Sequence, residues 1–345
     1  MNFLSRGVGL DIEVSPIKSD DIVKNLLKPH IEDHKLNGQR VDIGSFGQGL
    51  QRHLIYTLIK MSSKYSVSKK AAKKDFNPDY TLLLFEEPEA FLHPSQQDVL
   101  FRSLKELAGS DGQQVMLSTH SAQFVGKSAA DFTSIIRLHR SGQHSEIYQL
   151  NESKLQEVLD DNLVAAREFG EDQDPNFDEE VRMSDEELRY FLWLDSERSS
   201  LFFSRHVLLC EGASEKIYFD YLADNEWGFL REERVYILDC LGKYNIHRYI
   251  HLLTKLGIPH SVIFDGDRSR GNHATWNSIV NDASTSLTKG IHQFDHDLED
   301  YLGIPKPQGR NDLKPINIIK HHIEGLINTQ KKDNLEEVVR GLVGV

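Results

Sequence analysis

Short apolar runs alternate with amphipathic stretches along most of the chain. In the first part of the chain, the runs at 81–85, 115–118 and 134–138 have the length and composition of buried β-strands. The stretches at 50–61 and 96–107 carry apolar residues at helical spacing. This alternation predicts an α/β fold for the first part of the chain.

The same alternation returns toward the carboxyl end. Apolar runs at 206–210, 235–238 and 261–264 are separated by helical patterns at 214–222 and 246–256. Strands that are separated by helices form parallel sheets with right-handed crossovers. We therefore predict a second α/β unit, in which the carboxyl ends of the strands lie along one edge of a parallel sheet.

An acidic stretch separates these two patterns. Residues 151–200 carry 16 acidic and 5 basic side chains, and EFGEDQDPNFDEE at 168–180 is rich in helix breakers and reads as a linker. Ser184 and Glu187 have the spacing of a capping box at the start of a helix. We predict three parts: a first α/β part at 1–150, an acidic helical linker at 151–203 and a second α/β domain at 204–345.

The composition is that of an ordinary globular protein of 345 residues. The formal net charge is −13, but most of the acidic excess lies in the linker, so charge does not exclude a DNA partner. No apolar run reaches the roughly 20 residues that span a membrane, and no secretory signal pattern follows Met1. The only cysteines, Cys210 and Cys240, make no disulfide framework. We expect a cytoplasmic protein without membrane contact.

The first α/β part contains four features of a nucleotide site in a fixed order. GSFGQGLQR at 44–52 is a glycine-rich turn that opens a helix, and LLLFEE at 82–87 is a strand that ends in paired acids. The loop EPEAFLHP at 87–94 follows, and VMLSTHS at 115–121 is a strand that ends in a histidine. Glycine-turn amides suit a γ-phosphate, and paired acids suit Mg²⁺ and the attacking water. The predicted cofactor-binding residues are Gly47, Gln48, Glu86, Glu87 and His120.

This order resembles the C-terminal half of ABC-type ATPases, especially those related to SMC proteins. The resemblance implies that the glycine turn acts on a partner's nucleotide, that Glu86 and Glu87 are the Walker B acids, and that His120 is the switch histidine. The phosphate cradle G-x-x-x-x-G-K-[ST], known as Walker A, does not occur in the sequence. Three alternatives stay open, namely a degenerate lobe that only packs and dimerises, a lobe completed by a Walker A-bearing partner, and an ATPase with an unrecognised cradle. Binding or hydrolysis of ATP is therefore undecided.

A second set of acids follows the strands of the second α/β domain. HVLLCEGASEKIYF at 206–219 places Glu211 at a strand end and Glu215 one helical turn later. SVIFDGDRS at 261–269 ends another strand in Asp265 and Asp267. Carboxylates that are crowded at one sheet edge repel one another unless cations neutralise them, and hard oxygen ligands suit Mg²⁺ or Mn²⁺. The pattern predicts a divalent-metal site.

The glutamate-glycine pair and the D-x-D strand end together resemble the Toprim domain of topoisomerases, primases and nucleases. An ATPase half, an acidic helical segment and a Toprim domain in this order resemble the OLD (overcoming lysogenization defect) nucleases, most closely at the junction 185–212. The resemblance implies that Glu211, Glu215, Asp265 and Asp267 are the first metal ligands, that Asp297 or Glu299 completes a second metal site, and that Lys314 stabilises the transition state. Gly242 and Lys243 match a recurring Gly-Lys pair of the family, so Lys243 is expected to contact phosphate.

These features predict a DNA endonuclease that hydrolyses phosphodiesters with two Mg²⁺ or Mn²⁺ ions and serves anti-phage defence or DNA repair. The predicted catalytic residues are Glu211, Lys243 and Lys314. The resemblance also implies a homodimer or a larger homo-oligomer. The alternative is a non-catalytic DNA-binding or assembly subunit whose ATPase half is completed by a partner chain. The clustered acids favour the endonuclease, because a surface that only binds phosphates gains nothing from them.

Overall fold

The computed structural model describes most of the chain in two compact units. It describes residues 30–33, 39–45, 80–125, 129–168, 198–267, 273–307 and 309–345, and the single positions 47, 49, 51, 54, 57, 185, 186, 188 and 189. Unit 1 is Met1–Thr119 and unit 2 is His120–Val345. The boundaries expected after residues 150 and 203 stay predictions beside this division. None of the described helices combines the length and the apolar composition that crossing a membrane requires.

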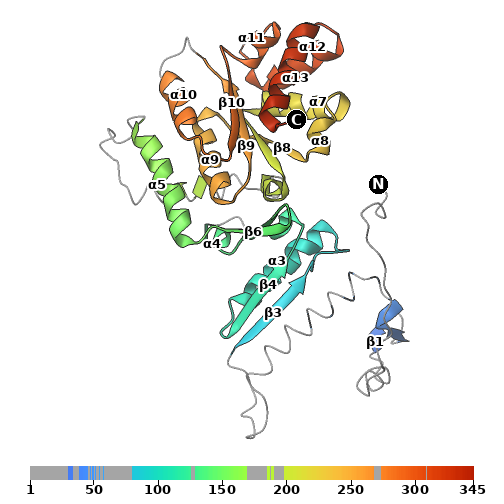
Figure 1. Ribbon diagram of the computed structural model, residues 1–345. Coiled ribbons are helices and arrows are strands. Elements are labelled where there is room, and N and C mark those ends of the chain that lie inside the picture. Colours follow the sequence, from blue (N-terminus) through green and yellow to red (C-terminus); the bar gives the residue numbers. More distant parts are fainter. Residues whose placement is uncertain are drawn as a thin grey trace. The chain divides into compact units, whose positions relative to one another are not determined.

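Unit 1 contains a parallel strand pair with one helix packed on it (Figure 1). The pair is β3 (Thr81–Glu86) and β4 (Gln113–Ser118), and α3 (Pro94–Ala108) connects the two strands. The helix begins at a capping box, in which the His93 ring accepts a hydrogen bond from the Ser95 amide and the Gln96 side chain accepts one from the His93 amide. The unit also contains an antiparallel pair, β1 (His30–Asp33) with β2 (Gln39–Asp42).

Unit 2 is built on a four-stranded parallel sheet in the order β10-β9-β7-β8 (Figure 1). The strands are β7 (His206–Cys210), β8 (Val235–Asp239), β9 (His260–Asp265) and β10 (Thr288–Phe294). The helices after β7 are α7 (Ala213–Asn225), α8 (Phe229–Glu232), α9 (Ile246–Lys255), α10 (His273–Asp282), α11 (Leu298–Leu302), α12 (Lys314–Ile323) and α13 (Thr329–Val343). The predicted parallel sheet of the second α/β domain is confirmed.

Successive residues of the central strand point into two different hydrophobic cores. Val207 and Leu209 of β7 pack into a cluster with α9 and the helix α5 (Glu152–Glu168), whereas Leu208 and Cys210 pack into a cluster with α7, α12 and α13. Because both faces of the sheet are covered, the strands read as continuous apolar runs in the sequence. The mixed α/β fold with a parallel sheet is therefore confirmed.

A hairpin lies near the start of unit 2, and here the bounds of one predicted strand are wrong. The helix α4 (Ala129–Phe132) is followed by β5 (Ile136–Ser141), which pairs antiparallel with β6 (His144–Gln149). The strand expected at 134–138 starts two residues later, because the amides of Ser134 and Ile135 bond back to Asp131 and Phe132 in the turn that ends α4. Most of the helix expected at 50–61, and most of the stretch 168–187, lie outside the described residues.

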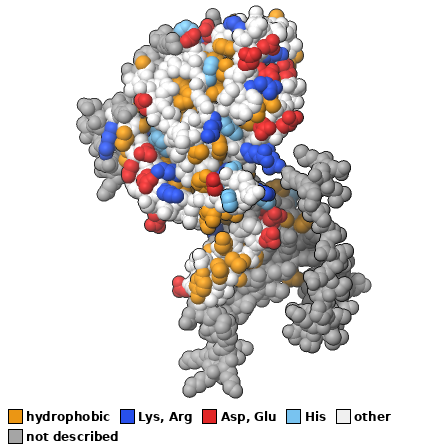
Figure 2. Space-filling model, viewed as in Figure 1, with side chains coloured by type: hydrophobic (Ala, Val, Ile, Leu, Met, Phe, Trp, Pro, Cys, Tyr) orange, Lys and Arg blue, Asp and Glu red, His pale blue; other side chains and the backbone are white. Residues whose placement is uncertain are grey.

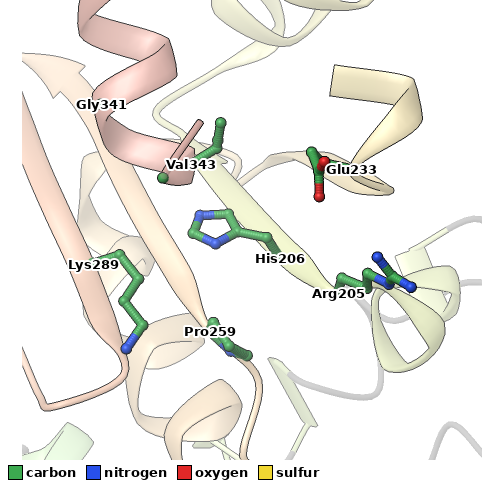
Figure 3. A pocket seen from close by; sticks show the side chains of 8 residues that line it. Arg205, His206, Glu233, Pro259, Lys289, Gly341 and Val343 are labelled. Carbon is green, nitrogen blue, oxygen red and sulfur yellow. The ribbon is translucent and has the colours of Figure 1, made fainter. Parts of the chain in front are cut away.

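A pocket of about 490 Å³ opens at the amino ends of the strands of unit 2 (Figure 3). It is lined by Arg205, His206 and Lys289, among other residues, and the ring of His206 lies at its centre. His206 Nε2 lies 3.1 Å from Ser261 Oγ. Burial, with smaller effects of His260 and Lys289, lowers the pKa of His206 to about 4. The folded state therefore keeps this histidine neutral.

We expect acidification to destabilise unit 2 through His206. Unfolding restores a pKa near 6.5, so the unfolded chain binds a proton that the folded chain refuses between about pH 6.5 and pH 4. Its contribution to the free energy of unfolding, roughly 1–3 kcal/mol, is present above pH 6.5 and is lost as the pH falls through this window. As the pH falls from 6.5 to 4.5, the free energy of unfolding of the His206→Gln variant in urea should rise relative to that of the wild type. The exposed His144→Gln substitution should keep the wild-type slope, and equal slopes for all three proteins would contradict this account.

Candidate metal centre at the carboxyl edge of the sheet

The predicted acids of unit 2 come together at the carboxyl edge of the parallel sheet. Glu211 follows the last residue of β7, and Asp265 is the last residue of β9. Glu215 lies in the first turn of α7. Asp297 is the N-cap of α11, and Glu299 lies in the first turn of that helix, which follows β10. Parallel strands end on one side of their sheet, so all these acids arrive at one edge.

Backbone amides hold three of these carboxylates in place. The Asp265 amide donates to Glu211 Oε2 at 3.0 Å, which ties the ends of β7 and β9 together. The Gly212 amide donates to Glu215 Oε2 at 3.1 Å, and the Asp300 amide donates to Asp297 Oδ1 at 2.9 Å. The backbone therefore fixes the positions of these carboxyl groups before any ligand is bound.

Three lysines lie among the acids. Lys243 has only 1 % of its surface exposed, and its Nζ lies 3.5 Å from Asp267 Oδ2 and 3.9 Å from Glu211 Oε2. Lys314 Nζ lies 3.5 Å from Glu299 Oε1, and Lys306 forms an ion pair with Asp297. The structure thus brings the predicted Lys243 and Lys314 to the acids and adds Lys306, which sequence reasoning missed. Its position in the loop IPKP gives no sign of a site.

The loops at this edge need glycine or a strained backbone. A Cβ on Gly266 would lie 2.2 Å from the carbonyl oxygen of Phe294, so only glycine fits between Asp265 and Asp267. Asp267 and Leu241 have positive φ angles of 47° and 59°. Non-glycine residues in this region cost free energy and are held there by their surroundings, which is common at functional sites.

Burial and mutual repulsion raise the pKa values of several acids. Burial raises the pKa of Glu215 to about 8 and that of Asp265 to about 9, and in both cases neighbouring carboxylates add to the effect. Burial also raises the pKa of Glu211, although Lys243 opposes this shift. For Asp297, the effect of burial is outweighed by the hydrogen bond from Lys306, so its pKa is lowered. Lys314 is partly buried, yet Glu299 and other acids raise its pKa.

The donor set fits hard divalent cations. Asp265 Oδ1 and both carboxylate oxygens of Glu299 are buried without a hydrogen-bond partner, and the Glu299 side chain is almost fully buried. Such oxygens lose their hydration and gain no hydrogen bond in return, which a cation would offset. Among the described residues, no three His, Cys, Asp or Glu side chains are already arranged around a point that a metal ion could occupy. The carboxylates pair with lysines and backbone amides instead. Glu211, Glu215, Asp265, Asp267, Asp297 and Glu299 stay the proposed metal ligands.

The residues predicted for nucleotide binding are placed only in part. Glu86 ends β3, and Glu87 follows with a positive φ of 42° and an amide that donates to the carbonyl of Ser118 at 2.9 Å. Gly47 is exposed, and Gln48 lies outside the described residues. His120 follows the end of β4 by two residues and is the first residue of unit 2. A nucleotide role for these residues stays a prediction.

Sequence reasoning also missed Glu89 in unit 1. This side chain is buried, and Thr119 Oγ1 donates a hydrogen bond to its Oε1. Glu89 therefore links the loop after β3 to the residue that follows β4. It stands two positions after the acid pair in EEPEAF, where it reads as one more exposed acid. The sequence holds no signal of its burial.

Comparison with known proteins finds two family matches along the chain. Residues 202–267 match the Overcoming lysogenization defect protein-like TOPRIM domain, and residues 9–125 match an AAA ATPase domain. The chain is 28 % identical over 228 residues to the Old nuclease of Escherichia phage P2, and these cover 66 % of this chain and 34 % of that protein. The chain carries an OLD-like TOPRIM domain.

Other similar proteins also carry nuclease names. The chain is 27 % identical over 254 residues to Endonuclease GajA of Bacillus cereus strain VD045, which covers 73 % of this chain and 36 % of the relative. It is 26 % identical over 187 residues to the OLD nuclease of Thermus scotoductus, which covers 54 % and 30 %. The chain thus spans about a third of the length of the curated relatives it matches.

The TOPRIM match ends at the second aspartate of the D-x-D pair. Glu211, Glu215, Asp265 and Asp267 fall inside the matched range 202–267. The acids of α11, and Lys314 at the start of α12, lie beyond it and are joined to the site by the fold alone. The ATPase match at 9–125 includes the glycine turn and the paired acids.

The raised acid pKa values predict that the stability of the metal-free chain falls as the pH rises. Glu215 and Asp265 keep protons when folded up to about pH 8 and pH 9, whereas the unfolded chain releases them near pH 4. Their contribution to stability is complete below about pH 4 and is lost as the pH rises toward 9. The thermal midpoint in EDTA should therefore fall between pH 5.5 and pH 8.5.

Mn²⁺ should restore the midpoint most strongly at the high-pH end, because a cation that binds only the folded state stabilises it. The Asp265→Asn variant should show a shallower fall in EDTA. Identical slopes for the variant and the wild type would contradict the raised pKa of Asp265.

Proposed function

We propose that this chain is a divalent-metal-dependent DNA endonuclease that acts through its Toprim domain. The observation that carries this proposal is the gathering of six carboxylates and three lysines at one sheet edge, with buried carboxylate oxygens that lack hydrogen bonds. The nuclease names of the relatives support a DNA substrate. Anti-phage defence or DNA repair is the proposed setting. The cytoplasm is the proposed location, with which the two buried free cysteines agree.

The side chains of the site divide into anion-binding and cation-binding groups. One Mg²⁺ or Mn²⁺ ion would be held by Glu211, Glu215, Asp265 and Asp267. A second metal site would be completed by Asp297 or Glu299. Bound divalent cations supply a Lewis acid for the scissile phosphate and lower the pKa of bound water. The acids must give up their protons to accept a cation, so metal binding releases protons at neutral pH.

The lysines supply fixed positive charge to the phosphate. Lys314 Nζ lies at the acid cluster on the start of α12 and would donate hydrogen bonds to a non-bridging phosphate oxygen. Lys243 is held on the other side of the strand ends, against Glu211 and Asp267. It would position these two carboxylates and contact the phosphate as DNA enters. Glu211, Lys243 and Lys314 are therefore the proposed catalytic residues.

The experiment that tests this function is plasmid cleavage. Supercoiled plasmid incubated with the protein and Mn²⁺ or Mg²⁺ should become relaxed and then linear, and EDTA should stop the reaction. The Lys314→Met variant should bind DNA and cut at least roughly ten times more slowly. Plasmid that stays supercoiled across Mg²⁺, Mn²⁺, Co²⁺ and Ca²⁺ would overturn the proposal.

A second candidate is a non-catalytic assembly subunit whose ATPase half is completed by a partner chain, or by a second copy in a homodimer or larger homo-oligomer. Exposed apolar side chains on β3 and β4 favour it, since Leu84 is 67 % exposed and Leu82 and Met116 are also exposed. Figure 2 shows such apolar side chains at the surface of the described part of unit 1. DNA binding in EDTA without cleavage in Mn²⁺ would support this candidate. Calorimetry with ATP and Mg²⁺ tests nucleotide binding separately.

A further inference from the structure

A buried ion pair joins Glu186 to α9, the helix that follows Lys243. Arg248 of α9 donates to both carboxylate oxygens of Glu186, from Nε at 2.6 Å and from Nη2 at 2.6 Å. Each residue is only 4 % exposed. Two parallel hydrogen bonds of this kind fix the guanidinium in one plane. Glu186 thus determines where the remaining nitrogen of Arg248 points.

That remaining nitrogen holds the loop of the metal centre. Arg248 Nη1 donates to the carbonyl oxygen of Tyr244, the residue directly after Lys243. On the other side of Lys243, the Gly242 amide donates to the carbonyl of Glu211 at 2.7 Å. The backbone is therefore held on both sides of Lys243, by the bond from Gly242 to Glu211 and by the bond from Arg248 to Tyr244. The Nζ atom of Lys243 reaches Glu211 and Asp267.

Other residues fix Glu186 from the side of α5. Asn162 of α5 donates from Nδ2 to Glu186 Oε2 at 3.3 Å, and His251 Nδ1 lies 2.8 Å from Asn162 Oδ1. The more exposed Arg189 also lies 3.3 Å from Glu186 Oε1. One chain of polar contacts therefore joins Glu186, α5 and α9.

The same elements also support the second loop of the site. The ring of Tyr244 meets Trp276 of α10 edge to face at 4.8 Å, and Trp276 packs in a small cluster with Ala165 of α5. One residue later, Asn277 donates from Nδ2 to the carbonyl of Gly266 at 2.8 Å. Gly266 separates Asp265 from Asp267. Contacts that start from α5 and Glu186 thus reach both the loop of Lys243 and the loop of Gly266.

We propose that Glu186 is a positioning residue for Lys243 and acts through Arg248, so that this buried pair determines the catalytic competence of the metal centre. This inference rests on the endonuclease function proposed above. Loss of the Glu186 carboxylate would release the guanidinium of Arg248, then the Tyr244 carbonyl, and then the ammonium of Lys243. Misplacement of a charged group by about 1 Å can slow an enzyme by up to a hundred-fold.

The test removes the pair without leaving a buried charge. In the double variant Glu186→Leu/Arg248→Met, apolar groups replace both partners, which commonly leaves stability intact. We expect kcat for plasmid nicking with Mn²⁺ to fall roughly ten-fold, while KM stays within about two-fold. The matched control is Glu157→Leu/Lys255→Met, which removes a more exposed ion pair between α5 and α9, the helix that also carries Arg248. It should cleave like the wild type.

Two further measurements separate positioning from a general structural role. In a Lys243→Ala background, the Glu186→Leu/Arg248→Met change should cause no further loss of kcat, because both act through the same ammonium. An additive loss, or wild-type kcat in the double variant, would overturn the proposal. Amide hydrogen exchange of the peptide 239–246 should be at least roughly ten times faster in the double variant than in the control. This second readout needs no cleavage, so it decides the proposal even if the wild type leaves plasmid intact. Equal exchange in the two variants would refute it.

Discussion

Plasmid cleavage by the Asp265→Asn variant should fall at least about a hundred-fold relative to the wild type. Asparagine has nearly the shape of aspartate but no negative charge, so the backbone can stay in place while one anionic ligand disappears. Asp265 Oδ1 is a buried oxygen without a hydrogen-bond partner, and the Asp265 amide ties β9 to Glu211. Initial rates of supercoil loss in Mn²⁺ measure the effect.

The neighbouring Asp295 supplies the matched control. It lies one residue after β10 at the same sheet edge, but its side chain is exposed. Asp295→Asn should cleave within about two-fold of the wild type, because exposed acids contribute little. The Asp265→Asn protein should also be more stable than the wild type in EDTA at pH 8.5, since burial and neighbouring acids raise the pKa of Asp265 to about 9. An inactive variant with higher stability cannot be explained by unfolding. Full activity of Asp265→Asn would exclude this metal centre.

The strand-end acids could be predicted because each one interrupts an apolar run. Glu211 and Asp265 stand directly where buried strands end, and parallel strands bring such positions together without further information. Asp297 and Glu299 are different. In FDHDLEDYL every acid looks like part of a solvated helix start, and only the packing of α11 shows that Glu299 is buried. The family resemblance, rather than the local pattern, indicated these two residues.

The lysines and the buried pair show where sequence reasoning ends. Lys243 was expected to contact phosphate, but its burial against Glu211 and Asp267 depends on three strands meeting. Glu186 lies in the most acidic part of the chain, where charge suggests solvent exposure. Its partner Arg248 is 62 residues away, and no local spacing rule connects them. Long-range polar pairs follow from the assembled fold and leave no periodic signal in the sequence.

Removal of the Arg137 guanidinium should cause the largest loss of stability among the substitutions considered. Arg137 of β5 is buried and donates to three carbonyl oxygens, those of Phe202 at 3.3 Å, Leu256 at 3.2 Å and Gly257 at 2.9 Å. It thereby fastens the β5–β6 hairpin to the residues before β7 and to the turn that ends α9. Position 257 also requires glycine, because its φ is +64° and a Cβ would lie 2.2 Å from the Tyr148 ring. The surroundings cannot close around a missing side chain.

The Arg137→Met variant keeps most of the length of the side chain but leaves these carbonyls without their charged donor. Hydrogen bonds from charged groups contribute about 1.5–3 kcal/mol each, and the three share one side chain, so a loss of roughly 3–5 kcal/mol in the free energy of unfolding is expected. Urea denaturation followed by tryptophan fluorescence measures it. Arg140→Met on the same strand is the control, since exposed Arg140 bonds to the nearby Gly142 carbonyl and should change stability by about 0.5 kcal/mol or less. Equal midpoints for the two variants would mean that the hairpin is held to the sheet by its apolar contacts alone.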